Sequence, residues 1–127
     1  MMIQFTGGAI DGCIKPPSSK SHTHRAIILS ALSGGVCTIS DPLLSYDTLA
    51  TVDAVRRMGS VADVSDERIT VDGSVLREPG EINVENSGTT MRLLTGICSL
   101  FAGETTLTGD ESIKKRPMGP LLDALGA

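Results

Sequence analysis

The sequence predicts an α+β fold in which a unit of short strands and helices is repeated along the chain. Two observations support this prediction. Amphipathic helical stretches alternate with short strands, and glycine or proline separates them. The order also recurs, because Gly59 lies as far after Arg25 as Gly126 lies after Arg92. This recurrence indicates duplicated units of about 67 residues.

The first unit is expected over residues 13–78, after a leading segment at residues 1–12. Short strands are predicted at residues 2–5 and 12–15, and two consecutive prolines stop the second one. The unit then continues with two helices and three strands.

The first predicted helix is capped by Ser19 or Ser21 and ends at Gly34 and Gly35. A strand at residues 36–40 follows it. The expected buried face of this helix consists of Ala26, Ile28, Leu29 and Leu32.

The second predicted helix is capped by Ser45 or Asp47 and ends at Gly59. Strands at residues 61–64 and 68–71 then pair as a hairpin. Apolar residues three apart give the second helix one buried stripe: Leu49, Val52, Val55 and Met58.

The second unit is expected over residues 79–127. It contains a predicted strand at 81–85, a helix at about 89–101, a strand at 104–108 and a short helix at 120–125. Unlike the first unit, it stops at its second helix. We therefore expect the chain to be a piece of a longer protein, with the second unit truncated.

Composition argues against several classes of function. Aromatic residues make up 2% of the chain and the net charge is -4, whereas nucleic-acid binders use aromatic platforms and a basic surface. No stretch resembles a signal peptide, and the longest apolar run, residues 93–102, is too short to span a bilayer. The widely spaced Cys13, Cys37 and Cys98 favour a reducing, cytoplasmic location without disulfides or zinc, and we expect them to fill the core.

Three short segments predict anion binding. Residues 20–25 (KSHTHR) and 86–92 (NSGTTMR) each place small polar residues before an apolar helix, with an arginine about one turn in. Helix N-termini offer free N–H groups, and guanidinium groups bind carboxylates and phosphates. A third cationic segment, residues 114–116, precedes Pro117, which is expected to begin a helix. The three segments together predict a small ligand with several negative charges.

The same segments resemble a known family. Residues 17–26, 86–92 and 109–118 are similar to the three N-terminal signatures of the EPSP synthase family, and residues 43–48 are similar to another of its stretches. The resemblance implies βαβαββ repeat units of the enolpyruvyl transferase type, in which mixed sheets carry packed helices. About one and a half units would be present here, and residues 1–12 would form a leading strand that belongs with the opposite domain.

The resemblance also implies a reaction. Family members transfer the enolpyruvyl group of phosphoenolpyruvate to the 5-hydroxyl of shikimate 3-phosphate and release phosphate, a step in aromatic amino-acid biosynthesis that needs no metal or other cofactor. The family's acid–base residues would lie outside this chain, so no catalytic residue is expected within it and the chain alone should be inactive. The implied partners are the two substrates, with no nucleic acid or membrane. The intact enzyme is expected to be a monomer, while unpaired sheet edges favour self-association of the piece.

Specific residues match substrate-binding positions of the family. Lys20 matches a lysine that contacts both substrates, and Ser21 and Arg25 match groups that bind shikimate 3-phosphate. Gly88 and Arg116 match groups that bind phosphoenolpyruvate. Further contacts are expected from neighbouring residues of the central signature: Asn86, Thr89 and Arg92.

Other interpretations of these residues remain open. Arg92 could pair with Asp47 or Glu85 inside the fold, and His22 and His24 are expected to be structural or exposed. Residues 114 and 115 are expected to be solvated lysines. The family usually has glycine where this chain has serine at position 18.

Two alternative functions use the same fold. UDP-N-acetylglucosamine enolpyruvyl transferase carries a cysteine in the loop before an Arg-Pro pair, and residues 109–115 contain none. A non-catalytic anion-binding module is the other alternative. RNA 3′-phosphate cyclase shares the repeat architecture, but the acidic balance and the three signatures argue against it.

Overall fold

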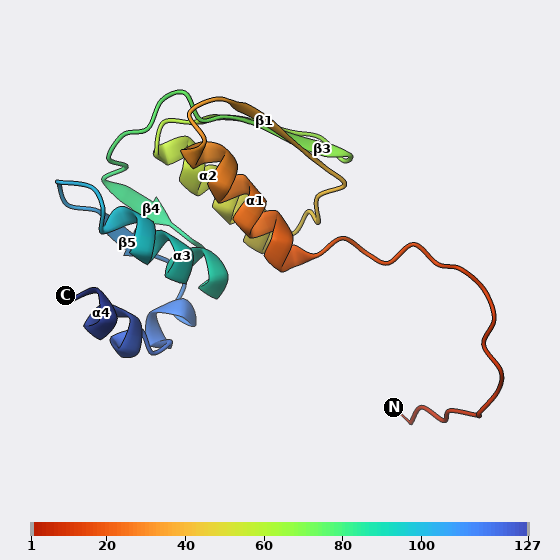
Figure 1. Ribbon diagram of the computed structural model, residues 1–127. Helices are drawn as coiled ribbons and strands as arrows, with labels where there is room; N and C mark the ends of the chain where they lie inside the picture. Colours follow the sequence, from red (N-terminus) through yellow and green to blue (C-terminus); the bar gives the residue numbers. More distant parts are fainter. Residues whose placement is uncertain (1, 127) are drawn as a thin grey trace.

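The computed structural model describes residues 2–126, and it confirms an α+β fold with mixed sheets and packed helices (Figure 1). Its elements in chain order are α1 (Lys20–Leu32), β1 (Val36–Ser40), α2 (Tyr46–Arg57), β2 (Val61–Val64), β3 (Arg68–Asp72), β4 (Glu81–Asn83), α3 (Gly88–Cys98), β5 (Thr106–Thr108), the 3-10 helix η1 (Ile113–Lys115) and α4 (Gly119–Leu125). None of the described helices combines the length and apolar character needed to cross a membrane.

The larger sheet has the strand order β1-β3-β2, and both of its strand pairs are antiparallel. Because side chains alternate along a strand, one face of this sheet is apolar and the other is polar. The apolar face is covered by α1 and α2 (Figure 1). Its residues are Cys37, Ile39, Ala62, Val64, Ile69 and Val71.

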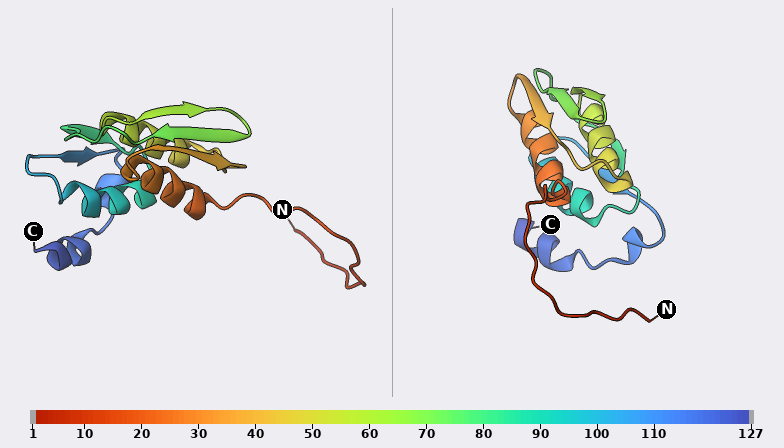
Figure 2. Two further views of the ribbon diagram at one scale, coloured as in Figure 1. Left: turned by 45° about the horizontal axis from the view of Figure 1, so that its top comes forward. Right: turned by 90° about the vertical axis from the view of Figure 1, so that its right-hand side faces the viewer.

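The smaller sheet pairs β4 with β5 in parallel, and α3 is the connection between them. A parallel pair requires such a crossover, which is why a helix lies between these two strands in the sequence. Figure 2 shows α3 beside this sheet and α4 at the end of the chain. No residue of α4 is buried.

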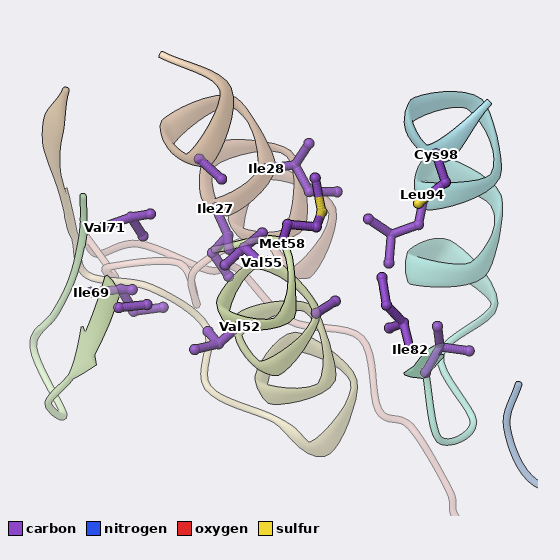
Figure 3. Packing of buried hydrophobic residues seen from close by; sticks show 14 of the residues in the cluster. Ile27, Ile28, Val52, Val55, Met58, Ile69, Val71, Ile82, Leu94 and Cys98 are labelled. Atoms are coloured by element: carbon purple, nitrogen blue, oxygen red, sulfur yellow. The ribbon is translucent and has the colours of Figure 1, made fainter. Parts of the chain in front are cut away.

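The core extends from the larger sheet through α1 and α2 to α3 (Figure 3). Ile69 and Val71 of β3 lie at one end, Met58 follows α2, and Ile82 and Leu94 lie at the other end. Each of these five side chains is at most 1% exposed. Full burial of an aliphatic side chain contributes roughly 1.5–3 kcal/mol, so this cluster holds the three helices in a fixed arrangement.

The two strands expected near the N-terminus are wrong. Residues 2–19 form neither helix nor strand, and this segment extends away from the rest of the chain in every view (Figures 1 and 2). Ile10 is 100% exposed and Ile14 is 91% exposed. A strand requires a neighbouring strand for its backbone hydrogen bonds, and the described chain provides none here.

The expected buried face of α1 is wrong in part, although Ile28 is buried as expected. Leu29 is 66% exposed and Leu32 is 42% exposed. The buried side of this helix consists of six residues: Thr23, His24, Ile27, Ile28, Ser30 and Ala31. Apolar residues occur on more than one side of this helix, so periodicity did not distinguish the faces. Polar residues with hydrogen-bonding partners belong to the buried side.

Some of the other predicted helices and strands agree with the structure, and others differ from it. The strand at residues 36–40, the hairpin and the Ser45 cap are confirmed. Helix α3 ends at Cys98 rather than near residue 101. Cys98 is buried as expected, whereas Cys37 is half-buried and Cys13 is exposed, so the expectation of three core cysteines is wrong.

Candidate anion-binding site

Three helices begin in the same way, with a serine N-cap in an extended conformation: Ser19 before α1, Ser45 before α2 and Ser87 before α3. Each hydroxyl accepts a hydrogen bond from a backbone N–H three residues later, which satisfies one of the free donors of the first turn. The donors are His22, Thr48 and Thr90. These N-termini carry the residues that the sequence assigns to anion binding.

Two threonines connect the N-termini of α1 and α2. The Leu43 N–H donates to Thr23 Oγ1 at 3.0 Å, and Thr48 Oγ1 donates to the Leu43 carbonyl at 2.9 Å. Thr48 Oγ1 also accepts a hydrogen bond from the Ser45 N–H at 2.8 Å, which completes a capping box. The loop between β1 and α2 is therefore attached to the first turn of α1, and the two helix entrances stay together.

A chain of buried polar side chains joins all three helices. His24 Nδ1 of α1 lies 2.6 Å from Thr51 Oγ1 of α2, and Thr51 Oγ1 lies 2.7 Å from Thr90 Oγ1 of α3. Thr90 Oγ1 lies 2.5 Å from the hydroxyl of Ser87, the N-cap of α3. We call these four residues the buried polar chain. Because it ends on a cap, it links the packing of α1 and α2 to the start of α3.

Burial lowers the pKa of His24, because the charged imidazolium loses its water. The carboxylate of Asp47 acts against this shift, and the ammonium of Lys20 acts with it. Within the described chain, the buried Nε2 of His24 has no hydrogen-bond partner. His24 is thus structural, as expected, and it is neutral inside the fold at neutral pH.

A hollow of about 390 Å³ lies at the entrance of α3. We call it the cationic hollow. It brings together five of the predicted contacts, although they come from distant parts of the sequence: Lys20, Gly88, Thr89, Arg92 and Arg116. Its complete lining is Lys20, Asp47, Gly88, Thr89, Arg92, Leu93 and Arg116.

The guanidinium of Arg116 lies directly against the first residue of α3. A Cβ atom at Gly88 would overlap Arg116 Nη1 and would stand 3.2 Å from Arg92 Nη1. The φ angle of Gly88 is ordinary, so the need for glycine here is one of space. Two guanidinium groups and the free N–H groups of a helix N-terminus therefore face the same small volume.

Arg92 does not make either of the ion pairs considered from the sequence. Its Nη1 donates to the Gly88 carbonyl and its Nη2 to the Pro117 carbonyl, both at 3.4 Å. The Asp47 carboxylate is instead 2.8 Å from Lys20 Nζ. Both partners of that ion pair are partly exposed, so it contributes little stability and can yield to a bound anion. The hollow contains three cationic side chains and one carboxylate.

The third cationic segment is not a helix entrance. Residues 113–115 form η1, and Arg116 follows it in an extended conformation. Helix α4 begins only at Gly119, with Pro120 in its first turn, so the expectation that Pro117 starts a helix is wrong. This extended backbone leads the Arg116 side chain back toward α3. The Lys114 ammonium is partly exposed and pairs with Glu111 at 3.0 Å.

Ser21 and Arg25 do not line the cationic hollow. Both are exposed on α1, four residues apart and therefore on one face of the helix. The side chain of neither residue makes a hydrogen bond or ion pair within residues 2–126. Two neighbouring donors on the exposed face of α1 are available to a ligand.

A larger hollow of about 790 Å³ lies between α3, β5 and α4. Its lining is mostly apolar, including Met91, Phe101 and Leu122. Its charged lining residues are Lys114 and Arg116, whereas the cationic hollow joins Arg116 with Lys20, Arg92 and the N-terminus of α3. We therefore place the candidate site in the cationic hollow rather than in this larger one.

Sequence reasoning missed the residues that support the site. The sequence predicts Thr51 and Thr90 only as positions within helices. It predicts Asp47 only as a cap or as a partner of Arg92. Asp110 belongs to the third signature, and its spacing from Ser112 is typical of an aspartate that binds backbone N–H groups two residues on. That signal was present in the sequence.

The lowered pKa of His24 predicts that stability depends on pH. Between the folded-state pKa and the ordinary value of 6.5, the unfolded chain binds a proton that the folded chain does not. The free energy of unfolding should therefore fall as the pH falls below 6.5, by up to about 1.4 kcal/mol per pH unit. Urea unfolding at several pH values measures this slope.

His24→Gln should flatten that slope. His22 is exposed and is the other histidine of the chain, so His22→Gln is the matched control and should leave the slope in place. An unchanged slope in the His24 variant would assign the effect to other groups.

The comparisons with known proteins identify the family. The family model described as EPSP synthase (3-phosphoshikimate 1-carboxyvinyltransferase) matches residues 5–127. The chain belongs to the EPSP synthase family. Its resemblance to the three family signatures is therefore confirmed.

Curated relatives are similar along almost the whole chain. The 3-phosphoshikimate 1-carboxyvinyltransferase of Nitrosopumilus maritimus is 50% identical over 93% of this chain and 28% of the relative. That of Methanocorpusculum labreanum is 49% identical over 98% of this chain and 31% of the relative. The chain thus spans less than a third of the length of these EPSP synthase family members.

A solved structure gives the same result for the fold. The EPSP synthase from Acinetobacter baumannii superposes with a TM-score of 0.83 at 34% identity, covering 91% of this chain and 27% of that one. The arrangement of helices and strands described above is therefore that of an EPSP synthase family member over this part of its length.

Proposed function

We propose that this chain supplies part of the substrate-binding wall of a 3-phosphoshikimate 1-carboxyvinyltransferase. In the proposed reaction, the 5-hydroxyl of shikimate 3-phosphate takes the enolpyruvyl group of phosphoenolpyruvate, and inorganic phosphate leaves. The observation that carries the proposal is the meeting of Lys20, Gly88 and Arg116 in the cationic hollow. Family membership supports the choice of substrates.

The phosphate of phosphoenolpyruvate is assigned to the entrance of α3. The helix N-terminus at Gly88 offers N–H donors and a partial positive charge, and Arg116 and Arg92 add guanidinium groups beside it. A guanidinium suits a phosphate because its donors match two oxygens at once. Thr89 lines the same volume and is a further proposed contact.

Lys20 is assigned to both substrates. It is the first residue of α1 and lines the cationic hollow, and Ser21 follows it on the same helix. Ser21 and Arg25 on the exposed face of α1 are assigned to shikimate 3-phosphate. The Asp47 carboxylate lies 2.8 Å from the Lys20 ammonium, and a substrate anion would replace this partner.

We assign no acid–base residue within this chain and propose that it has no transferase activity alone. The buried histidine is separated from solvent, and the carboxylate nearest the site, Asp47, is paired with Lys20. An assay of phosphate release on the purified chain should therefore show no saturable turnover.

Two-dimensional amide NMR tests the binding assignments directly. Phosphoenolpyruvate should shift the Gly88 and Thr89 amides, and Arg116→Gln should weaken this binding by roughly tenfold or more. Shikimate 3-phosphate should shift residues of the first turns of α1, and Arg25→Ala should weaken that binding while leaving phosphoenolpyruvate binding in place. Lys115→Gln is a suitable control because its exposed side chain does not line the hollow.

Three outcomes would contradict the proposal. Turnover by the chain alone would show that the catalytic groups are present in it. Shifts that appear with a UDP-sugar but not with shikimate 3-phosphate would point to the other enolpyruvyl transferase. Substrate affinities that are unchanged in both Arg25→Ala and Arg116→Gln would show that the assigned residues are not part of the site.

A further inference from the structure

We propose that Asp110, acting through Asn86, is a positioning residue that fixes the Arg116 guanidinium over the N-terminus of α3. The proposal rests on the proposed function of this entrance as a phosphate site. It also changes the role of Asn86 from a ligand contact to a support. We call Asp110 and Asn86 the arginine bracket.

The carboxylate of Asp110 is occupied on both sides. Its Oδ1 accepts the backbone N–H groups of Ser112 at 2.9 Å and Ile113 at 2.8 Å, which fixes the start of η1. Its Oδ2 accepts a hydrogen bond from Asn86 Nδ2 at 2.5 Å. The Asn86 carbonyl Oδ1 in turn accepts from Arg116 Nη2 at 2.7 Å. One carboxylate therefore sets both the turn before Arg116 and the amide that holds its guanidinium.

The hydrogen-bonding chemistry of the three groups favours one orientation of the Asn86 amide. An ionised carboxylate only accepts hydrogen bonds and a guanidinium only donates them, whereas an amide does both. Asp110 thus requires the NH₂ of Asn86 to face it, which turns the amide carbonyl toward Arg116. With the amide reversed, its oxygen would face the carboxylate and its NH₂ would face the guanidinium. Asp110 therefore determines that the carbonyl oxygen of the Asn86 amide, rather than its NH₂ group, faces Arg116.

The bracket leaves the useful donors of Arg116 available. Arg116 Nη2 is held by Asn86, while Nη1 faces Gly88 on the side of the cationic hollow. Asn86 has its carbonyl and one amide hydrogen committed, so it has little left to offer a ligand. An arginine that is held in place before binding loses less side-chain entropy when an anion arrives.

The backbone around the bracket is specialised to bring its parts together. The Asp110 N–H donates to the Glu85 carbonyl at 3.0 Å, and a Cβ at Gly109 would overlap that same carbonyl. Glu85 has a φ of 52°, which is unusual for a residue other than glycine. Non-glycine residues in this region cost stability and persist where the surrounding structure requires them. Here the turn places Asn86 between the aspartate and the arginine.

The bracket keeps its charge across the neutral range. The Ile113 backbone N–H holds the pKa of Asp110 below its usual value, and the Asn86 amide, the Ser112 N–H and the Arg116 charge act in the same direction. Desolvation of the carboxyl acts against them. At every neutral pH at which phosphate would bind, the Asp110 carboxylate thus accepts hydrogen bonds and does not donate them.

Asp110→Asn tests the proposal, because the lost charge and the lost bracket should change the phosphate affinity in opposite directions. Removing a negative charge near the site should, by charge alone, tighten the binding of inorganic phosphate. Loss of the bracket should instead weaken it, by roughly tenfold, because the new NH₂ group opposes that of Asn86 and releases Arg116. Inorganic phosphate is the probe, and the Gly88 amide signal of the full 127-residue chain reports its dissociation constant.

Glu111→Gln is the matched control. It removes the same charge one residue away, and within residues 2–126 the Glu111 carboxylate forms its ion pair with the exposed Lys114. Its phosphate affinity should be unchanged or slightly higher. Asn86→Ala is a second variant that leaves the Asp110 turn in place, and it should weaken phosphate binding as Asp110→Asn does.

A second readout separates failure of the bracket from failure of the proposed function. The heteronuclear NOE of Arg116 Nε–H should indicate a rigid side chain in the unaltered chain and a mobile one in both variants, with no ligand present. Rigid Arg116 without phosphate binding would reject the function but keep the bracket. An Asp110→Asn chain that is folded and binds phosphate as tightly as the unaltered chain, with Arg116 still rigid, would overturn the proposal.

Discussion

Replacing Gly88 with alanine is expected to weaken the binding of phosphate and phosphoenolpyruvate by roughly 10- to 100-fold, while folding is retained. The new Cβ would occupy the position of Arg116 Nη1. That atom is the far end of a flexible side chain, so the guanidinium can move away and the backbone need not. Alanine also favours a helix by about 0.5–1 kcal/mol over glycine, which opposes any loss of stability.

Gly96→Ala is the matched control for Gly88→Ala. Gly96 lies in the same helix, and a Cβ there would meet nothing within 4 Å. It should give the gain in helix stability without the loss of affinity. NMR titration measures the affinity and urea unfolding the stability. If Gly88→Ala kept full affinity, Arg116 would not be part of the anion site.

Replacing Thr51 with valine is expected to lower the free energy of unfolding by roughly 2–4 kcal/mol. Valine has nearly the shape of threonine, so the effect comes from the lost hydroxyl. Thr51 is fully buried, and its Oγ1 is the shared partner of His24 Nδ1 and Thr90 Oγ1. Without it a buried imidazole nitrogen loses its partner, and burying an unsatisfied polar group costs about 1–3 kcal/mol.

Thr51→Ser separates the hydroxyl from the methyl group. It keeps the hydrogen bonds of the buried polar chain and loses one buried methyl, so it should cost only about 1 kcal/mol. Urea unfolding of the two variants side by side decides the matter. A valine variant as stable as the serine variant would mean that the buried polar chain contributes no stability.

Local chemistry allowed much of the fold to be predicted from the sequence. Ser45 or Asp47 is predicted as the cap of the second helix because such side chains satisfy free helix donors, and in the structure Ser45 makes that bond. Alternation around a polar turn predicts the hairpin at residues 61–71, and β2 and β3 pair there. Each of these signals lies within a few residues and needs no distant partner.

The face of α1 and the N-terminal strands could not be predicted in this way. Leu29 fits an apolar stripe as well as Ile27 does, and the choice between them is made by α2 and the sheet. A strand at residues 12–15 depends on a neighbour that local sequence does not specify. These outcomes are decided by contacts between elements.

The sequence predicts residues that line the candidate site, but not the residues that hold them in position. The signatures indicated Lys20, Gly88 and Arg116, and the structure brings them into one hollow. The arginine bracket depends on the pair Asn86 and Asp110, 24 positions apart, and the buried polar chain on the pair Thr51 and Thr90, 39 positions apart. Only the folded chain reveals which polar groups meet over such separations.

The cationic hollow draws on four separate stretches of the sequence, at Lys20, at Asp47, at residues 88–93 and at Arg116. No single short peptide contains more than one of these stretches. A synthetic fragment could reproduce one motif letter by letter and still lack the other walls. Recognition at this place is therefore a property that appears only together with the tertiary structure, and it vanishes when the helices separate.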